Sequence, residues 1–188
     1  MSTAQPNKQN NPAFDPDAKI VKLKSNGTLT LREVLLQEIK RMYHIEKAVL
    51  KAFPKMVKNA CAFDLIQAGS IYLENTKTRI VRLEDAFAHI EEKPEHAKSP
   101  SIDALLTEAE EIIEGAKFGN VRDIGIVLVF HKMVHYKIAT YTMLSAFSEL
   151  IDHQEIMVLF AESLNEEKIM DLRTSKIIAS IRLGSDEY

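Results

Sequence analysis

The stretch that decides the fold is Val121 to Leu150, VRDIGIVLVFHKMVHYKIATYTMLSAFSEL. It predicts one long helix that is apolar on most of its circumference, which is typical of a helix at the centre of a protein. His131, His135 and Lys137 nevertheless lie within this apolar run. Ionisable side chains are costly to bury unless they are paired, hydrogen-bonded or bound to a metal. We therefore expect the functional centre of the protein along this helix.

The rest of the chain predicts four more helices and no strand, because apolar residues recur at helical spacing. Thr30, with Glu33 three residues later, can form a capping box that begins the first helix, and Thr28 is an alternative start. Pro54 should end or kink that helix within about a turn. The other helices are expected at residues 63–90, 101–116 and 154–181. On the second helix, apolar residues at steps of seven are Ile66, Leu73, Ile80 and Phe87.

The order of these helices indicates an all-α, ferritin-like four-helix bundle. About thirty residues separate the second long helix from the third, and they include the short helix 101–116. A connection of this length lets the two long helices run parallel, as in bundles with one long crossover. We expect residues 28–182 to form the bundle, with a flexible polar tail at 1–27 and a C-terminal tail at 183–188.

The composition excludes several classes of protein. A net charge of -3 argues against a nucleic-acid-binding protein, whose binding face is usually basic. The single cysteine, Cys61, rules out an intramolecular disulfide and suits a reducing compartment. The longest apolar run, 124–130, is far too short to span a bilayer, and the N-terminus has no apolar signal core. We therefore expect a cytoplasmic protein with neither nucleic acid nor membrane as a partner.

Several carboxylates lie on or near the predicted core-facing seams. Glu38 occupies a seam position of the first helix, and Glu46 lies at the edge of the same stripe. Glu167 lies on the seam of the last helix, with Asp171 one turn further on. Such carboxylates can converge in a bundle core, where carboxylate-bridged metal pairs are built, although ion-paired or partly exposed side chains are the alternative. The seam of the last helix comprises Ile156, Phe160, Ser163, Glu167, Met170, Thr174, Ile177 and Ile181.

The central helix carries a histidine pair and a lysine. His131 and His135 are four residues apart, which places two imidazoles on one helix face, where they can hold zinc. The alternative is that one histidine is solvated and the other is hydrogen-bonded in the core. Lys137 either extends its amine to the surface or pairs with a carboxylate of another helix. The apolar residues that share its face are Phe130, Met133, Val134, Tyr141 and Leu144.

Four segments carry a resemblance to a known family over residues 31–178. They are LLQEIKRMYHIEKAVLKAFPKM (35–56), YLENTKTRIVRLEDAF (72–87), VRDIGIVLVFHKMVHYKIATY (121–141) and LNEEKIMDL (164–172). In these segments the chain resembles the YciE/YciF-like stress-associated proteins of the ferritin-like superfamily. The resemblance implies a ferritin-like bundle, a homodimer and, by analogy with the superfamily, a buried metal site.

The chain departs from the family pattern at three positions that matter for a metal. Tyr72 stands where the pattern has His, and Val134 and Lys137 stand where it has two Glu. Lys137 thus exchanges a negative charge for a positive one, which would repel a metal dication. We expect its amine to neutralise Glu38 or Glu167 in place of a metal. The candidate metal ligands that remain are Glu38, Glu46, His135, Glu166, Glu167 and Asp171, with His131 as a further candidate.

Three functions remain open. We favour a non-enzymatic, stress-associated ferritin-like protein whose metal site is degenerate and holds no cofactor. The alternative is a metalloprotein that binds iron, manganese or zinc, with oxidoreductase activity, through the remaining carboxylates, His135 and His131. The third is a plain helical dimer whose exposed surfaces bind a protein partner. Metal content distinguishes the first two, and a Lys137 amine close to Glu38 or Glu167 favours the first.

Overall fold

The structure, a computed structural model, describes residues 27–181. This part of the chain is all-α and contains no strand, as predicted. The helices begin and end close to the expected residues, except that the first continues through Pro54 for five more residues. Apart from residue 27, the predicted tails lie outside the described residues. The helices are α1 (Leu31–Asn59), α2 (Phe63–His89), α3 (Pro100–Gly115), α4 (Asn120–Leu150) and α5 (Gln154–Ser180).

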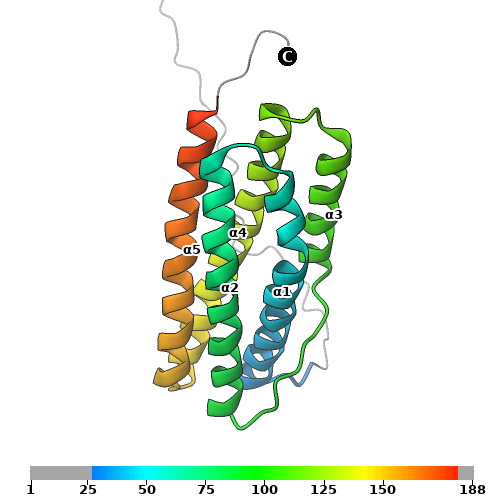
Figure 1. The fold of residues 1–188 in the computed structure, drawn as a ribbon. Helices are drawn as coiled ribbons and strands as arrows, with labels where there is room; N and C mark the ends of the chain where they lie inside the picture. Colours follow the sequence, from blue (N-terminus) through cyan, green and yellow to red (C-terminus); the bar gives the residue numbers. More distant parts are fainter. Residues whose placement is uncertain (1–26, 182–188) are drawn as a thin grey trace, which may run out of the picture.

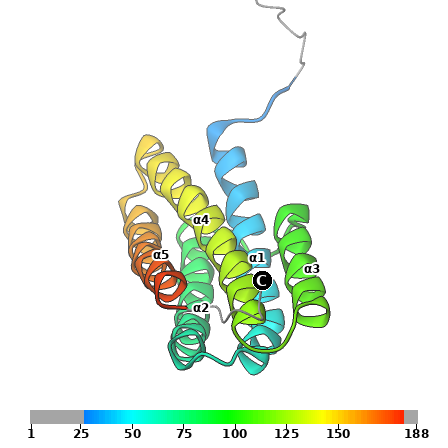
Figure 2. The same cartoon turned by 90° about the horizontal axis from the view of Figure 1, so that it is seen from above.

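The four long helices form a bundle with one long crossover. α1 and α2 form one antiparallel hairpin, and α4 and α5 form a second (Figure 1). The crossover after α2 returns along the molecule and carries α3, so α4 runs parallel to α2 (Figure 1). Around the bundle the helices pack in the order α1, α2, α5, α4, and α3 packs outside against α1 and α4 (Figure 2). This is the ferritin-like arrangement that the length of the crossover predicted.

The start of α4 fixes two loops at one end of the bundle. Asp123 is fully buried and accepts hydrogen bonds from the backbone N–H groups of Cys61 (2.8 Å) and Ala62 (2.7 Å). These donors precede α2 and would otherwise lack an acceptor. Arg122 donates to the carbonyl oxygen of Ala116, 3.0 Å from its Nη2. The Arg-Asp pair therefore ties the α1–α2 and α3–α4 loops to α4.

α3 approaches α4 most closely at Gly125. A β-carbon at this position would lie 2.5 Å from Cγ2 of Ile112, closer than two carbon atoms can pack. The absence of a side chain at Gly125 thus allows α3 to lie against the outside of the bundle.

The sequence pattern predicted the core-facing side of α5 correctly but not that of α2. On α5, every predicted seam residue from Ile156 to Ile177 is buried. On α2, the predicted Ile66, Leu73 and Ile80 are only half-buried. The buried side of α2 is centred one residue earlier, which is a rotation of about 100°. Hydrophobicity did not reveal it because it includes the polar residues Thr76 and Arg79. The buried residues of α2 are Leu65, Ala68, Gly69, Tyr72, Thr76, Arg79, Leu83, Ala86 and Phe87.

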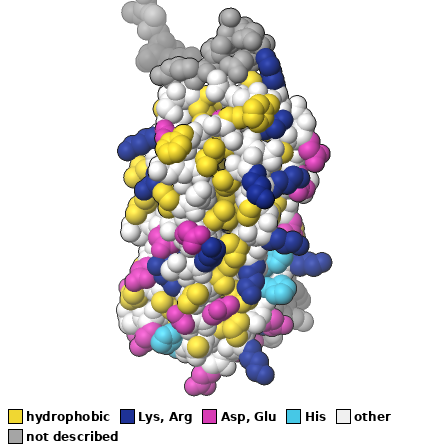
Figure 3. Space-filling model, viewed as in Figure 1, with side chains coloured by type: hydrophobic (Ala, Val, Ile, Leu, Met, Phe, Trp, Pro, Cys, Tyr) yellow, Lys and Arg dark blue, Asp and Glu magenta, His cyan; other side chains and the backbone are white. Residues whose placement is uncertain are grey.

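The face shown in Figure 3 carries acidic and basic side chains mixed with hydrophobic ones. Neither sign of charge occupies that face alone. Within residues 27–181, no helix has the combination of length and hydropathy that a membrane-spanning helix needs.

Candidate functional site

One ionisable side chain from each long helix reaches the centre of the bundle. Glu46 from α1, Arg79 from α2, Lys137 from α4 and Glu167 from α5 are all fully buried. These four residues are termed the charge ring. With two acids and two bases, its formal charge is zero.

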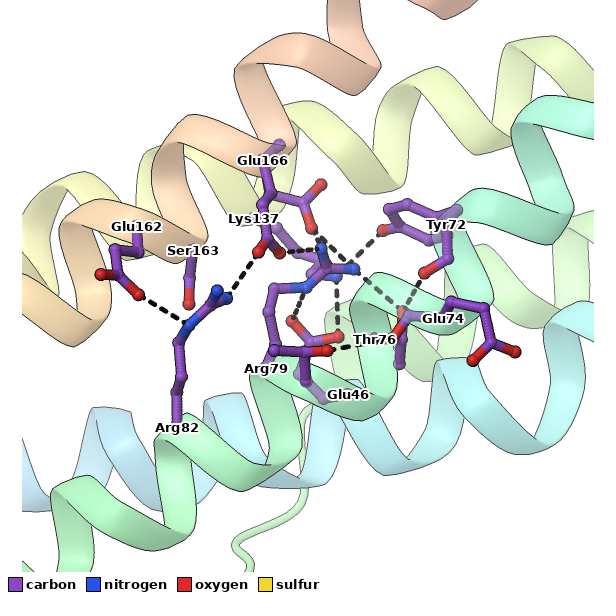
Figure 4. Close-up of polar contacts among 12 residues, drawn as sticks. Glu46, Tyr72, Glu74, Thr76, Arg79, Arg82, Lys137, Glu162, Ser163 and Glu166 are labelled. Atoms are coloured by element: carbon purple, nitrogen blue, oxygen red, sulfur yellow. Dashed lines mark hydrogen bonds and ion pairs between the residues drawn. The ribbon is translucent and has the colours of Figure 1, made fainter.

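Each acid in the charge ring contacts both bases. Glu46 Oε1 lies 3.0 Å from Arg79 Nε, and Glu46 Oε2 lies 2.8 Å from Lys137 Nζ. Glu167 Oε1 lies 2.7 Å from Lys137 Nζ and 3.2 Å from Arg79 Nη2. Charges of opposite sign therefore alternate around the four helices, and Figure 4 shows Glu46, Arg79 and Lys137 pointing toward one another.

Neutral side chains complete the surroundings of the charge ring. Tyr141 donates its hydroxyl to Glu46 Oε1 (2.8 Å), and Arg79 Nη2 donates to Thr76 Oγ1 (2.9 Å). Lys137 Nζ donates to the hydroxyl oxygen of Tyr72, 3.0 Å away. These contacts satisfy polar groups that have no access to water. The aromatic rings of Phe53 and Phe130 pack against that of Tyr72, with centroid distances of 5.1 and 4.7 Å.

A chain of ion pairs leads from the charge ring to the surface. Arg79 Nη1 lies 3.0 Å from Glu166 Oε2, and Glu166 Oε1 lies 2.7 Å from Arg82 Nη1. Arg82 Nε in turn lies 3.1 Å from Glu162 Oε2, whose side chain is 55% exposed. Figure 4 shows these side chains in sequence between α2 and α5. Of the four ring residues, Arg79 is the one that connects the charge ring to these surface ion pairs.

The two acids of the charge ring differ in pKa. Burial opposes ionisation of Glu46, but the charges of Arg79 and Lys137 outweigh it and hold the pKa of Glu46 below its ordinary value of 4.5. For Glu167, burial outweighs the same two cations, and the pKa is raised above 4.5. Burial also raises the pKa values of Tyr72 and Tyr141 well above 10.0, with nearby carboxylates adding to the effect. Both tyrosines therefore remain hydroxyls.

The residues of the charge ring do not fit a carboxylate-bridged metal pair. Ferritin-like metal pairs use Glu residues from two helices and Glu-x-x-His motifs from the other two. The ring has two carboxylates and no imidazole, and both carboxylates face cationic side chains. Two unit charges 4 Å apart interact by about 4 kcal/mol at an effective dielectric of 20, and a dication doubles this. Lys137 and Arg79 therefore oppose a metal ion at this position.

The structure brings only part of the predicted site together. Glu46, Glu167 and Lys137 meet in the charge ring, and Glu166 lies at its edge. Lys137 contacts Glu167, one of its two expected partners. The assignment of Glu38 to the buried site is wrong. Glu38 is half-buried and pairs with Arg41. The side of α1 that faces the core is formed by Leu35, Ile39 and Met42, and Glu38 lies next to it.

The assignment of His135 to the buried site is also wrong. Successive residues of a helix are about 100° apart, so His135 and Lys137 point in nearly opposite directions. With Lys137 buried, His135 has a side chain that is 55% exposed. His131, His135 and Asp171 instead form a separate cluster at the surface between α4 and α5.

The sequence reasoning missed Arg79 and Tyr141. Arg79 lies on the seam of α2 that runs from Leu65 through Tyr72 and Thr76 in steps of three and four, but hydrophobicity alone does not single out this seam because part of it is polar. The sequence pattern places Tyr141 on the face of Lys137 but predicts no polar contact for it. Its hydroxyl contact with Glu46 depends on how α1 and α4 are rotated against each other.

Comparison with known proteins supports the fold and the resemblance. The model of the family described as a domain of unknown function, DUF892, matches residues 30–182. YciF of Escherichia coli (strain K12) is 28% identical over 149 residues, which are 79% of this chain and 90% of that protein. The solved structure of the E. coli stress protein YciF has a TM-score of 0.77 at 27% identity and covers 80% of this chain and 95% of that chain. YcfI from Rhodopseudomonas palustris, described as a candidate structural protein, has a TM-score of 0.77 at 33% identity and covers 85% of this chain and 99% of that chain.

Proposed function

Since this chain belongs to the DUF892 family, we propose that it is a stress-associated, ferritin-like bundle that works without an internal metal ion and without catalysis. The observation that carries the proposal is the charge ring. Its two cations lie within 3.2 Å of the carboxylates that a metal would otherwise bridge. The site is thereby neutral without a metal. Glu46 is hydrogen-bonded to Arg79, Lys137 and Tyr141, whereas Glu167 makes ion-pair contacts and has no hydrogen bond of good geometry within residues 27–181.

Access to the charge ring also supports a non-catalytic role. All four side chains are fully buried, so a substrate would reach them only if the bundle opened. Because Tyr72 and Tyr141 stay protonated, they do not supply a phenolate as a metal ligand or base. The stress association rests on the relatives, since E. coli YciF is described as a stress protein.

Metal analysis tests the absence of an internal metal. The protein and its His131→Ala/His135→Ala variant are expressed in medium supplemented with iron and manganese and analysed by inductively coupled plasma mass spectrometry. The double variant removes the two imidazoles at the α4–α5 surface, so any metal that it retains is not held by that pair. We expect substoichiometric iron and manganese in the double variant. Iron or manganese at one or more ions per chain in this variant would refute the proposal.

The absence of catalysis is tested with ferrous iron. Oxygen consumption after addition of ferrous iron should not exceed that of buffer, because the charge ring provides no site where two irons can react with oxygen. A catalytic rate that is lost on Glu46→Gln substitution would instead establish the metalloprotein alternative.

The remaining parts of the proposal come from the family resemblance and the composition. We propose a homodimer in the cytoplasm. Light scattering after size-exclusion chromatography tests the dimer, and a monomeric mass would exclude it. Quantitative mass spectrometry after osmotic, oxidative and acid challenge tests the stress association. Constant abundance under all three challenges would contradict it.

A further inference from the structure

A second group of ligating side chains lies outside the charge ring, on the surface between α4 and α5. His131 and His135 come from consecutive turns of α4, and Asp171 comes from α5. The Nε2 atoms of the two imidazoles are 3.1 Å apart, and Asp171 Oδ1 lies 3.0 Å from His135 Nε2. One ligand atom from each residue lies within 4.8 Å of those from the other two.

Hydrogen bonds around His131 determine which of its nitrogens is free. Thr174 is buried and donates its hydroxyl proton to the carbonyl oxygen of Asp171, 3.0 Å away. With that proton used, Thr174 Oγ1 is left as an acceptor toward His131 Nδ1, 2.8 Å away, and we assign the ring proton to Nδ1 on this basis. A neutral His131 therefore carries its proton on Nδ1 and presents a lone pair at Nε2. Histidines that bind metals are commonly oriented by such a hydrogen bond from the second ring nitrogen.

The two imidazoles and the Asp171 carboxylate thus lie close together, with too few N–H protons to give each of them a hydrogen bond. Asp171 Oδ1 is shielded from solvent and has no hydrogen-bond partner of good geometry within residues 27–181. A proton on His135 Nε2 is directed toward His131 Nε2, so it does not form a hydrogen bond of good geometry with Asp171 Oδ1. In a tetrahedral zinc site, bonds of about 2.0–2.1 Å place ligand atoms about 3.4 Å apart. Two of the three distances between ligand atoms, 3.0 and 3.1 Å, come close to this spacing, and all three lie within 4.8 Å. Asp171 Oδ1 also lies 3.4 Å from His131 Nδ1.

We propose that His131, His135 and Asp171 bind a divalent cation of the zinc type at the α4–α5 surface. Two imidazoles and one carboxylate suit zinc, whereas magnesium and calcium prefer oxygen ligands alone. The three side chains are 37%, 55% and 28% exposed, so the cation enters from solvent and a water molecule completes the coordination. This site is separate from the charge ring and does not depend on the proposed function of the bundle interior.

Isothermal titration calorimetry with zinc chloride tests the site on the full-length protein. We expect one zinc ion per chain. His135→Ala should weaken binding by more than about tenfold, because a direct ligand is lost. The matched control is His89→Ala, which removes an exposed histidine at the end of α2 and should leave zinc binding unchanged. Failure of the wild-type protein to bind stoichiometric zinc, or unchanged binding by His135→Ala, would overturn the proposal.

Thr174→Val tests the orientation of His131 separately from the ligands. Valine keeps the shape of the buried side chain but cannot accept the hydrogen bond from Nδ1, so zinc should bind about tenfold more weakly. Circular dichroism confirms that each variant is folded. The absorption spectrum of the cobalt(II)-substituted protein gives an independent measurement, because tetrahedral coordination produces intense visible bands. An octahedral cobalt spectrum identical to that of His135→Ala would contradict a three-ligand protein site.

Discussion

Replacing Lys137 by methionine should destabilise the protein strongly. Methionine fills similar space, but it removes the contacts of Lys137 Nζ with Glu46 (2.8 Å) and Glu167 (2.7 Å). Two fully buried carboxylates would then face the single guanidinium of Arg79. Removing one partner of a buried ion pair costs about 3–5 kcal/mol. For a chain of this size, that loss corresponds to a fall in Tm of about 6–20 °C.

Urea unfolding followed by circular dichroism measures this loss, and a second variant tests its cause. Lys137→Met/Glu167→Gln again leaves one acid with one base in the core, so it should be more stable than Lys137→Met alone. The matched control is Lys132→Met, at an exposed lysine that pairs with Glu108, and it should change the free energy of unfolding by less than about 1 kcal/mol. The reasoning fails if Lys137→Met is as stable as the wild type. It also fails if the double variant is no more stable than Lys137→Met.

Three further predictions concern the loops, the packing of α3 and the charge ring. Asp123→Ala leaves two backbone N–H groups without their acceptor and should lower the free energy of unfolding by about 1–3 kcal/mol in urea titrations; equal stability would contradict this. Gly125→Ala should destabilise the protein in the same assay despite the better helix propensity of alanine, because its Cβ would lie 2.5 Å from Cγ2 of Ile112. Adding Ile112→Ala should relieve that clash. A stabilised Gly125→Ala variant would disprove the prediction. Carboxyl carbon NMR should give a pKa below 4.5 for Glu46 and above 4.5 for Glu167, and the reverse order would contradict the pKa assignment. Glu46 then contributes stability above its unfolded pKa, and this contribution is lost as the pH falls through its lower folded pKa. The contribution of Glu167 has the opposite pH dependence: it is present below the unfolded pKa and is lost as the pH rises through the higher folded pKa.

The helices and their connectivity could be predicted because they depend on local patterns. The seam of α5 is regular from Ile156 to Ile177, and the crossover is long enough to let α4 run parallel to α2. The limit of α1 was harder to predict. Pro54 removes one backbone donor, but tertiary packing on both sides of it keeps the helix continuous to Asn59.

The candidate site could be predicted only where one side chain contrasted with its surroundings. Lys137 was conspicuous because its face is otherwise apolar. Arg79 was not, because α2 is rich in polar residues and its buried face could not be chosen by hydrophobicity alone. Glu38 and His135 were misplaced for a related reason. A shift of one or two residues rotates a side chain by about 100–200°, and only the packing of neighbouring helices determines that rotation.

The distribution of charges between the two halves of the bundle has a consequence for how they assemble. The α1–α2 hairpin contains its own acid–base pair, Glu46 with Arg79, and the α4–α5 hairpin contains Lys137 with Glu167. Each half can therefore form a neutral pair before the halves dock, so docking need not bury an isolated charge. A slip of one half by a single helical turn, about 5.4 Å, would separate Lys137 from Glu46 and Arg79 from Glu167 while leaving both internal pairs intact. These two ring contacts, together with the ion pairs of Glu166 with Arg79 and Arg82, thus favour one axial register over others that apolar side chains alone would tolerate.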